Sequence, residues 1–207
     1  MISTSPMAGM HQPDVPEPPT RILGQDELRK LIAACERNKG FEGLRDTAMI
    51  RLFADCGGRL SEIAGLTLSD LELDEEVVGI VGSGHRRRTV PIGARTCNSL
   101  HKYLRVRERH YAAKLPDLSL GRKGSMTSTG IAQMIERRGR QAGLGHVHPH
   151  QLRHSFAHDW LSHGGQESDL MLLAGLRDQA KLRRYGTLAP DERARAAHRR
   201  LSLGERL

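Results

Sequence analysis

Aromatic side chains are scarce in this chain, since Phe, Tyr and Trp together make up 3% of its 207 residues. Proteins that hold single-stranded nucleic acid commonly stack its bases on such rings. The scarcity of rings therefore makes base stacking a poor candidate for the main mode of binding.

Cysteine is also rare, and the three present, Cys35, Cys56 and Cys97, are widely spaced. Their spacing fits neither a zinc site nor a disulfide framework, which is typical of a reducing compartment. No apolar run approaches the length of a membrane span, and the N-terminus lacks the apolar core of a signal peptide. We therefore expect a cytoplasmic protein without a membrane segment.

Positive charge, by contrast, is in excess, with 32 Lys and Arg against 24 Asp and Glu and a formal net charge of +8. Such a balance favours an acidic partner, and nucleic acid is the first candidate. A basic protein whose charges are merely solvated would have the same composition, so charge alone does not decide between the two.

In residues 1–20, Pro13, Pro16, Pro18 and Pro19 lie among polar and acidic residues, and no Lys or Arg is present. This composition predicts a disordered tail or linker, and it excludes a basic DNA-binding arm. The remainder, 21–207, is long enough for one domain with a sizeable core.

Helical spacing of apolar residues dominates this domain. It predicts helices near 25–39, 42–56, 59–66, 94–110 and 128–141. It also predicts one helix that begins at 149, a separate short helix that ends at 174, and one over 190–201. Between them, 71–81 and 86–92 are rich in Val and Ile and flank a glycine-containing turn, which predicts a β-hairpin. We expect 116–125 to be loop and Arg138 to point outward. The fold class expected is mainly α with a small antiparallel β-sheet.

The segment from Pro149 carries the most informative side chains. Proline is common in the first turn of a helix, and there His150 and Arg153, three residues apart, share one face. A guanidinium and an imidazole side by side at a helix start suit a phosphate group. Downstream, Tyr185 follows two arginines and is a candidate to attack such a phosphate.

These residues resemble the C-terminal signature of tyrosine recombinases, the phage integrase family. That signature is H-x-x-R, then a Gly-His or Gly-Trp pair, then a nucleophilic tyrosine nine residues on. His150 and Arg153 match its first part, Gly175-Leu176 takes the place of the pair, and Tyr185 lies nine residues after Leu176. The spacing agrees, but the residue at 176 differs.

Two further boxes resemble the family. C-G-G-R-L-S-E places Arg59 where the family has an arginine that binds the scissile phosphate, and Glu62 is spaced to form an ion pair with it. Taken alone, such a pair on a helix surface would mean little. G-S-G at 82–84 places Ser83 where the family has a lysine that protonates the leaving 5′ oxygen. Arg86, Arg87 and Arg88 follow as candidates for DNA phosphate contacts, but arginine is too basic to replace that lysine as a proton donor.

The resemblance implies a tyrosine-recombinase catalytic domain that cleaves and rejoins double-stranded DNA through a 3′-phosphotyrosine. Tyr185 would be the nucleophile, Arg59, His150 and Arg153 would bind the phosphate, and neither a metal nor another cofactor would be needed. It further implies docking of the helix at 190–201 on a second recombinase protomer. The N-terminal DNA-clamping domain of the family is expected to be absent from this chain.

Alternatives remain open at this point. Ser83 and Leu176 also suit a DNA-binding remnant with impaired chemistry, or a module that pairs with a full-length recombinase. The alternating His146, His148 and His150 suggest a metal site, but neither a carboxylate nor a cysteine nearby completes the set.

Overall fold

The structure is a computed structural model, and it describes residues 21–82, 84, 86–176, 195 and 198. The predicted tail at 1–20, Ser83 and Tyr185 lie outside the described residues, as does the helix predicted at 190–201 except for residues 195 and 198. Its elements are α1 (Gln25–Glu36), α2 (Phe41–Cys56), α3 (Leu60–Ala64), η1 (Leu68–Asp70), β1 (Leu71–Glu72), β2 (Val77–Val81), β3 (Arg87–Pro91), α4 (Ala94–Arg107), β4 (Leu120–Gly121), β5 (Gly124–Ser125), α5 (Ser128–Gln141), α6 (Pro149–Ser162) and α7 (Glu167–Ala174). The predicted fold class, mainly helical with a small antiparallel sheet, is confirmed.

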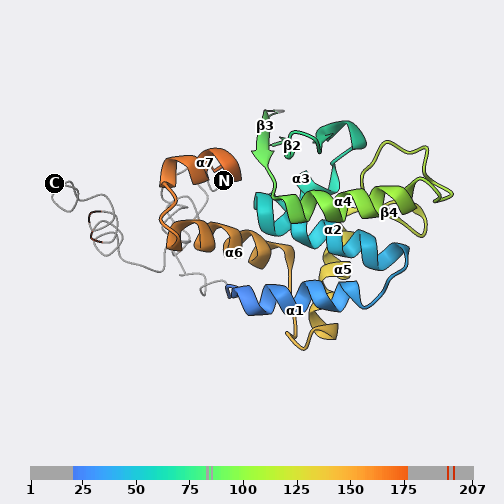
Figure 1. The fold of residues 1–207 in the computed structure, drawn as a ribbon, viewed down its shortest axis with the longest axis horizontal. Coiled ribbons are helices and arrows are strands. Elements are labelled where there is room, and N and C mark those ends of the chain that lie inside the picture. The colour runs from blue at the N-terminus through green and yellow to red at the C-terminus, as the bar shows by residue number, and fades with distance from the viewer. Residues whose placement is uncertain (1–20, 83, 85, 177–194, 196–197, 199–207) are drawn as a thin grey trace, which may run out of the picture.

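Helix α2 runs through the middle of the bundle, between α1 and α4, and also packs on α5 and α6 (Figure 1). It is buried on nearly all sides, and Met49, Leu52 and Phe53 are completely buried in the main core. Because α2 contacts so many neighbours, it fixes the position of the helices that carry the candidate site.

The sheet lies at one end of the bundle, where β2 pairs with both β1 and β3 in antiparallel register. The strand predicted over 71–81 is divided by a turn, since Glu76 takes a left-handed conformation with φ 53°. The β2–β3 hairpin agrees with the prediction.

The prediction of a plain loop over 116–125 is wrong, because β4 and β5 form a second small hairpin there. Hydrogen bonds from buried side chains, rather than a high strand propensity of the sequence, fix the segment that leads into this hairpin. The hydroxyl group of buried Tyr103 donates to the carbonyl of Leu118 and accepts from the amide of Leu120. Arg107, also buried, donates to four backbone carbonyls of the segment that connects α4 to β4.

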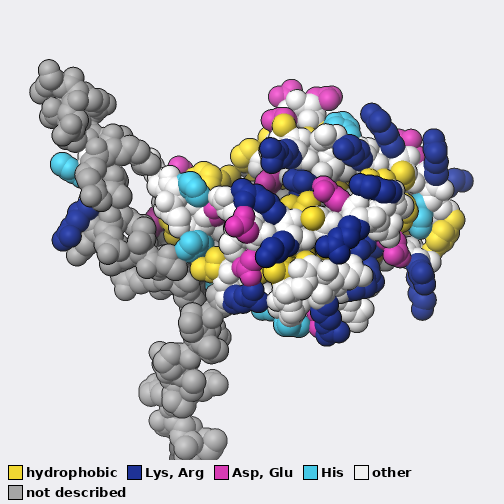
Figure 2. Space-filling model, turned by 60° about the horizontal axis from the view of Figure 1, so that its bottom comes forward, with side chains coloured by type: hydrophobic (Ala, Val, Ile, Leu, Met, Phe, Trp, Pro, Cys, Tyr) yellow, Lys and Arg dark blue, Asp and Glu magenta, His cyan; other side chains and the backbone are white. Residues whose placement is uncertain are grey.

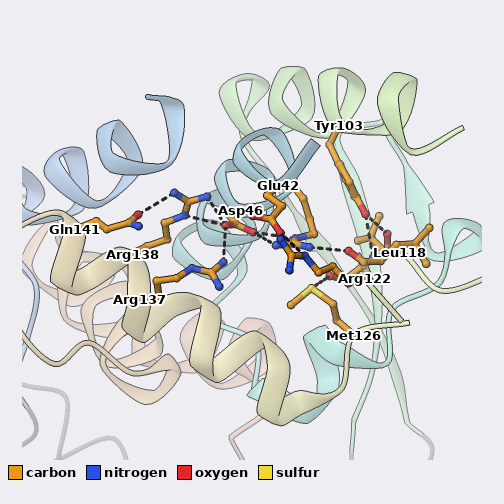
Figure 3. A network of polar contacts seen from close by, with 12 residues as sticks. Glu42, Asp46, Tyr103, Leu118, Arg122, Met126, Arg137, Arg138 and Gln141 are labelled. Atoms are coloured by element: carbon orange, nitrogen blue, oxygen red, sulfur yellow. Dashed lines mark hydrogen bonds and ion pairs between the residues drawn. The ribbon is translucent and has the colours of Figure 1, made fainter. Parts of the chain in front are cut away.

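The outward position predicted for Arg138 is also wrong. Asp46 on α2 is fully buried, and Arg138 on α5 donates to its carboxylate over 2.8 and 2.7 Å (Figure 3). Arg45 approaches the other carboxylate oxygen at 2.6 Å, and Arg137 lies 3.6 Å away. This network joins α2 to α5, and the chain continues from α5 into α6.

A smaller apolar cluster joins α6 to α7 and is formed by Ala157, Leu161, Leu170, Ala174 and Leu176. It is separate from the main core, against which Leu173 of α7 also packs. Helix α7 is thus positioned by α6, by this apolar contact and by polar contacts. Within the described part of the chain, no helix is both long and apolar enough to cross a membrane.

The Asp46 network predicts a large stability effect. Asp46→Ala should lower the free energy of unfolding by about 3–5 kcal/mol, because it leaves buried arginine charges without their counterion. Urea denaturation measures the change. Glu36→Ala removes the half-exposed carboxylate that pairs with Arg51 and should cost about 1 kcal/mol or less. Equal losses in the two variants would contradict this account of the network.

Candidate phosphate-binding site

The site begins at the start of α6. Pro149 occupies its first position, and Gln151 accepts a hydrogen bond from the amide of His148 at 2.9 Å, which caps the helix. Arg153, one turn in, is 4% exposed and donates to the carbonyl of Gly57 at 2.6 Å and to that of Ala174 at 2.8 Å. One guanidinium group thus connects α6 to the ends of both α2 and α7.

Gly57 makes the first of these contacts possible. It ends α2 in a left-handed conformation with φ 55°, which glycine adopts without strain. A Cβ atom there would lie 2.2 Å from the ring of Phe156 on α6. Only glycine therefore lets the chain turn this close to α6 and place Arg59 two residues later.

Arg59 forms the predicted ion pair with Glu62. It precedes α3, its amide donates to Glu62 Oε2 at 2.8 Å, and its Nη1 donates to Oε1 at 2.9 Å. Arg88 of β3 binds the same carboxylate through both terminal nitrogens, at 3.1 and 2.8 Å. Burial raises the pKa of Glu62, but the hydrogen bonds from Arg88 and Arg59 outweigh it and hold that pKa below its usual value.

Three arginines from other elements donate hydrogen bonds to the C-terminal end of helix α7. Arg88, Arg153 and Arg59 donate to the consecutive carbonyls of Leu173, Ala174 and Gly175, over 2.9, 2.8 and 2.9 Å. The last carbonyls of a helix have no partner within it and form the negative end of its dipole, so they attract cations. Gly175 closes the helix with φ 61°.

The contacts with α7 bring Arg59 and Arg153 together, although Arg59 precedes α3, Arg153 lies on α6 and the two are 94 residues apart in the chain. Since they hold the adjacent carbonyls of Gly175 and Ala174, their guanidinium groups converge on one place. The side chain of Arg59 is 40% exposed, and two of its five N–H groups donate to other described residues. The arrangement therefore has a cationic group directed toward solvent, as anion binding requires.

His150 lies one turn from Arg153 on the same face and is exposed. Its Nε2 is 3.1 Å from Nε2 of His154, which is 6% exposed. One of these nitrogens must accept while the other donates, so the two rings cannot both be fully protonated while this bond exists. His154 was not among the predicted site residues, although its spacing of four residues from His150 on a helix is a signal for such a contact.

The other histidines of the predicted alternating set turn to different partners. His146 Nδ1 lies 3.1 Å from Glu136 on α5, whereas His148 is the N-cap residue of α6. Burial, together with His146 and His150 nearby, lowers the pKa of His148. Among the described residues, no group of three or more His, Cys, Asp or Glu is placed to hold a metal ion.

The three hairpin arginines lie in different environments. Arg86 is exposed, and Arg87 is half-exposed with Nη1 3.3 Å from Asp70. Arg88 points inward to Glu62, and its side chain is 15% exposed. Because side chains alternate along a strand, neighbouring arginines on β3 face opposite sides of the sheet. Phosphate contact by these three residues stays a prediction.

Leu176 is 8% exposed and packs in the apolar cluster that joins α6 to α7. It contributes apolar contact at the position where the family signature has His or Trp, and its side chain has no hydrogen-bond donor.

Comparison with known proteins accounts for this arrangement. The phage integrase family matches residues 21–192. The chain belongs to the phage integrase family. A tyrosine recombinase XerC from Xanthomonas campestris pv. campestris (strain B100) is 34% identical over 186 residues, which cover 89% of this chain and 56% of that protein. The chain thus spans little more than half the length of this family member.

Solved structures of family members agree with the fold. The crystal structure of XerA recombinase is similar with a TM-score of 0.75 and 26% identity, over 93% of this chain and 67% of that one. XerH site-specific recombinase, in a pre-cleavage complex with its difH substrate, is similar with a TM-score of 0.73 and 25% identity, over 86% of this chain and 54% of that one.

The lowered pKa of Glu62 predicts a pH-dependent loss of stability. Glu62→Gln should reduce the free energy of unfolding at pH 7 by about 3 kcal/mol. This is the lower end of the loss of about 3–5 kcal/mol that is usual when a buried ion pair is broken, because Arg59 is partly exposed. The carboxylate's contribution is present above its ordinary pKa of 4.5 and is lost as pH falls through the lowered folded value. The difference between wild type and variant should therefore shrink in acid.

Urea denaturation between pH 7 and pH 3 measures this effect, with Glu75→Gln, an exposed carboxylate in the turn before β2, as the control. A difference between wild type and Glu62→Gln that does not vary with pH would show that the charge of Glu62 is not what stabilises the site.

Proposed function

We propose that this chain is the catalytic part of a site-specific DNA recombinase that cleaves and rejoins duplex DNA through a 3′-phosphotyrosine at Tyr185. The observation that carries the proposal is the convergence of Arg59 and Arg153 beside an exposed His150. Family membership supports the same reaction class, and the DNA in the XerH complex supports duplex DNA as the substrate.

In the proposed reaction, the phenol oxygen of Tyr185 forms a bond to a backbone phosphorus while the bond from that phosphorus to the 5′ oxygen breaks. Negative charge on the non-bridging oxygens increases in the transition state. Preorganised N–H donors from Arg59 and Arg153 would stabilise it, each typically contributing roughly 10²-fold or more in rate. A 5′ hydroxyl of another strand then reverses the step, so the bond energy is conserved without a cofactor.

Two protons must move in this step. The ordinary pKa of tyrosine is about 10, so its phenol must lose a proton as it attacks. His150, which shares a hydrogen bond with His154, is the proposed acceptor or an additional donor to the phosphate. The leaving 5′ oxygen must gain a proton, and Ser83 stands where the family has lysine for this purpose.

A second candidate function, DNA binding with impaired chemistry, is favoured by two substituted positions. Leu176 is an apolar packing residue and cannot hydrogen-bond a phosphate, and Ser83 is a poor acid at neutral pH. Lys and Arg side chains are spread over the face in Figure 2, with Asp and Glu among them, so basic groups would remain available to DNA phosphates without catalysis.

The proposal extends to partners and location. Assembly on DNA with a second copy or with another recombinase, through the segment at 190–201, would complete the enzyme. A protein acting on chromosomal DNA would work in the cytoplasm at the nucleoid.

Covalent capture tests the function. The chain is incubated with a pool of nicked duplexes, denatured in SDS and examined for DNA-linked protein. We expect an adduct from wild type and none from Tyr185→Phe, because the phenol oxygen is the atom that joins the phosphate. Tyr111→Phe alters an exposed tyrosine that is 72% accessible and should leave the adduct unchanged.

Adduct formation by Tyr185→Phe at the wild-type level would reject this nucleophile. Failure of every protein to form an adduct, while each still shifts duplex DNA, would favour the DNA-binding function instead.

A further inference from the structure

Arg88 makes three hydrogen bonds with two elements of the site. Its two terminal nitrogens bind the two carboxylate oxygens of Glu62, at 3.1 and 2.8 Å, and its Nε donates to the carbonyl of Leu173 at 2.9 Å. A planar guanidinium group is suited to such paired contacts, whereas the ammonium group of lysine is a single point of charge.

We propose that Arg88 is a positioning residue, which orients Arg59 through Glu62 and holds the end of α7, rather than a ligand of DNA phosphate. This inference rests on the proposed function. Glu62 also binds Arg59 at 2.9 Å, so a displaced carboxylate would move the arginine proposed to bind the scissile phosphate. The carbonyl of Leu173 lies three residues before Leu176, from which the chain continues toward Tyr185.

Burial and charge separate Arg88 from its neighbours on the hairpin. Its side chain is 15% exposed, and the carboxylate of Glu62, which is 4% exposed, neutralises its charge locally. Arg86 is exposed, and the side chain of Arg87 is 52% exposed. A phosphate approaching the hairpin would therefore meet Arg86 or Arg87 first.

Gly175 fits closely against Arg88 from the α7 side. A Cβ atom added at Gly175 would lie 3.0 Å from Nη1 and 3.1 Å from Cζ of Arg88, and φ there is 61°. Gly175→Ala should therefore disturb Arg88 without removing any charge from the protein. It provides a second, independent variant for the same contact.

The first test measures duplex DNA affinity over a range of salt concentrations for wild type, Arg88→Met and Arg86→Met. Loss of one phosphate contact lowers the slope of log affinity against log salt by about one. We expect an unchanged slope for Arg88→Met. Arg86→Met, which removes one charge from the same hairpin, is the matched control. A decrease of about one for Arg88→Met would overturn the proposal.

The second test measures the rate of covalent capture at saturating DNA. Misplacement of a catalytic group by about 1 Å can reduce a rate roughly 10²-fold. We expect a loss of that order for Arg88→Met and Gly175→Ala, and partial recovery in Arg88→Lys. A wild-type rate in folded Arg88→Met would overturn the proposal.

The third test needs no DNA, so it remains decisive if wild type captures none and the proposed function fails. Amide hydrogen exchange in the last turn of α7 should become faster in Arg88→Met and Gly175→Ala but not in Arg86→Met. Circular dichroism verifies that each variant is folded. Unchanged exchange in both folded variants would show that Arg88 does not hold α7.

Discussion

The C-terminal end of α7 depends on three guanidinium groups that meet its last carbonyls. Arg88 comes from β3, Arg153 from α6 and Arg59 from the residue before α3, and each donates to one of three consecutive carbonyls. The helix dipole and the unpaired carbonyls make this end of α7 a favourable place for positive charge. The same contacts bring Arg153 together with the partly exposed Arg59, so one set of interactions stabilises the fold and forms the candidate site.

The negative charge of Glu62 offsets the electrostatic repulsion between these neighbouring guanidinium groups. Its buried carboxylate lies between Arg59 and Arg88, and their hydrogen bonds keep it ionised despite burial. At the opposite end of α2, Asp46 does the same for Arg45 and Arg138. Each buried carboxylate is paired on more than one side, which is what makes burial of an ionised group tolerable.

Local patterns in the sequence predicted much of this molecule, because they depend on residues close together in the chain. His150 and Arg153 on one helical face, the pair of Arg59 with Glu62, and the β-hairpin are all of this kind. The ion pair of Arg138 with Asp46 joins residues 92 positions apart, so no local pattern indicates it. The contacts of the arginines with α7 could not be predicted from the sequence either, because every residue has a backbone carbonyl and no pattern indicates which one a side chain will contact. For Arg88, a run of three arginines does not say which one faces inward.

We propose that the arginines for phosphate binding are in place in this chain, whereas Ser83 leaves the 5′ oxygen without the acid that would protonate it. Capture rates on a duplex with sulfur in place of the bridging 5′ oxygen test it directly, because a thiolate leaves without protonation, as thiols ionise near pH 8.5 and alkyl hydroxyls far higher. We expect much faster capture on the sulfur-containing duplex than on ordinary DNA, and a smaller difference in Ser83→Lys. Equal wild-type rates on both duplexes, or no capture on either, would contradict the claim.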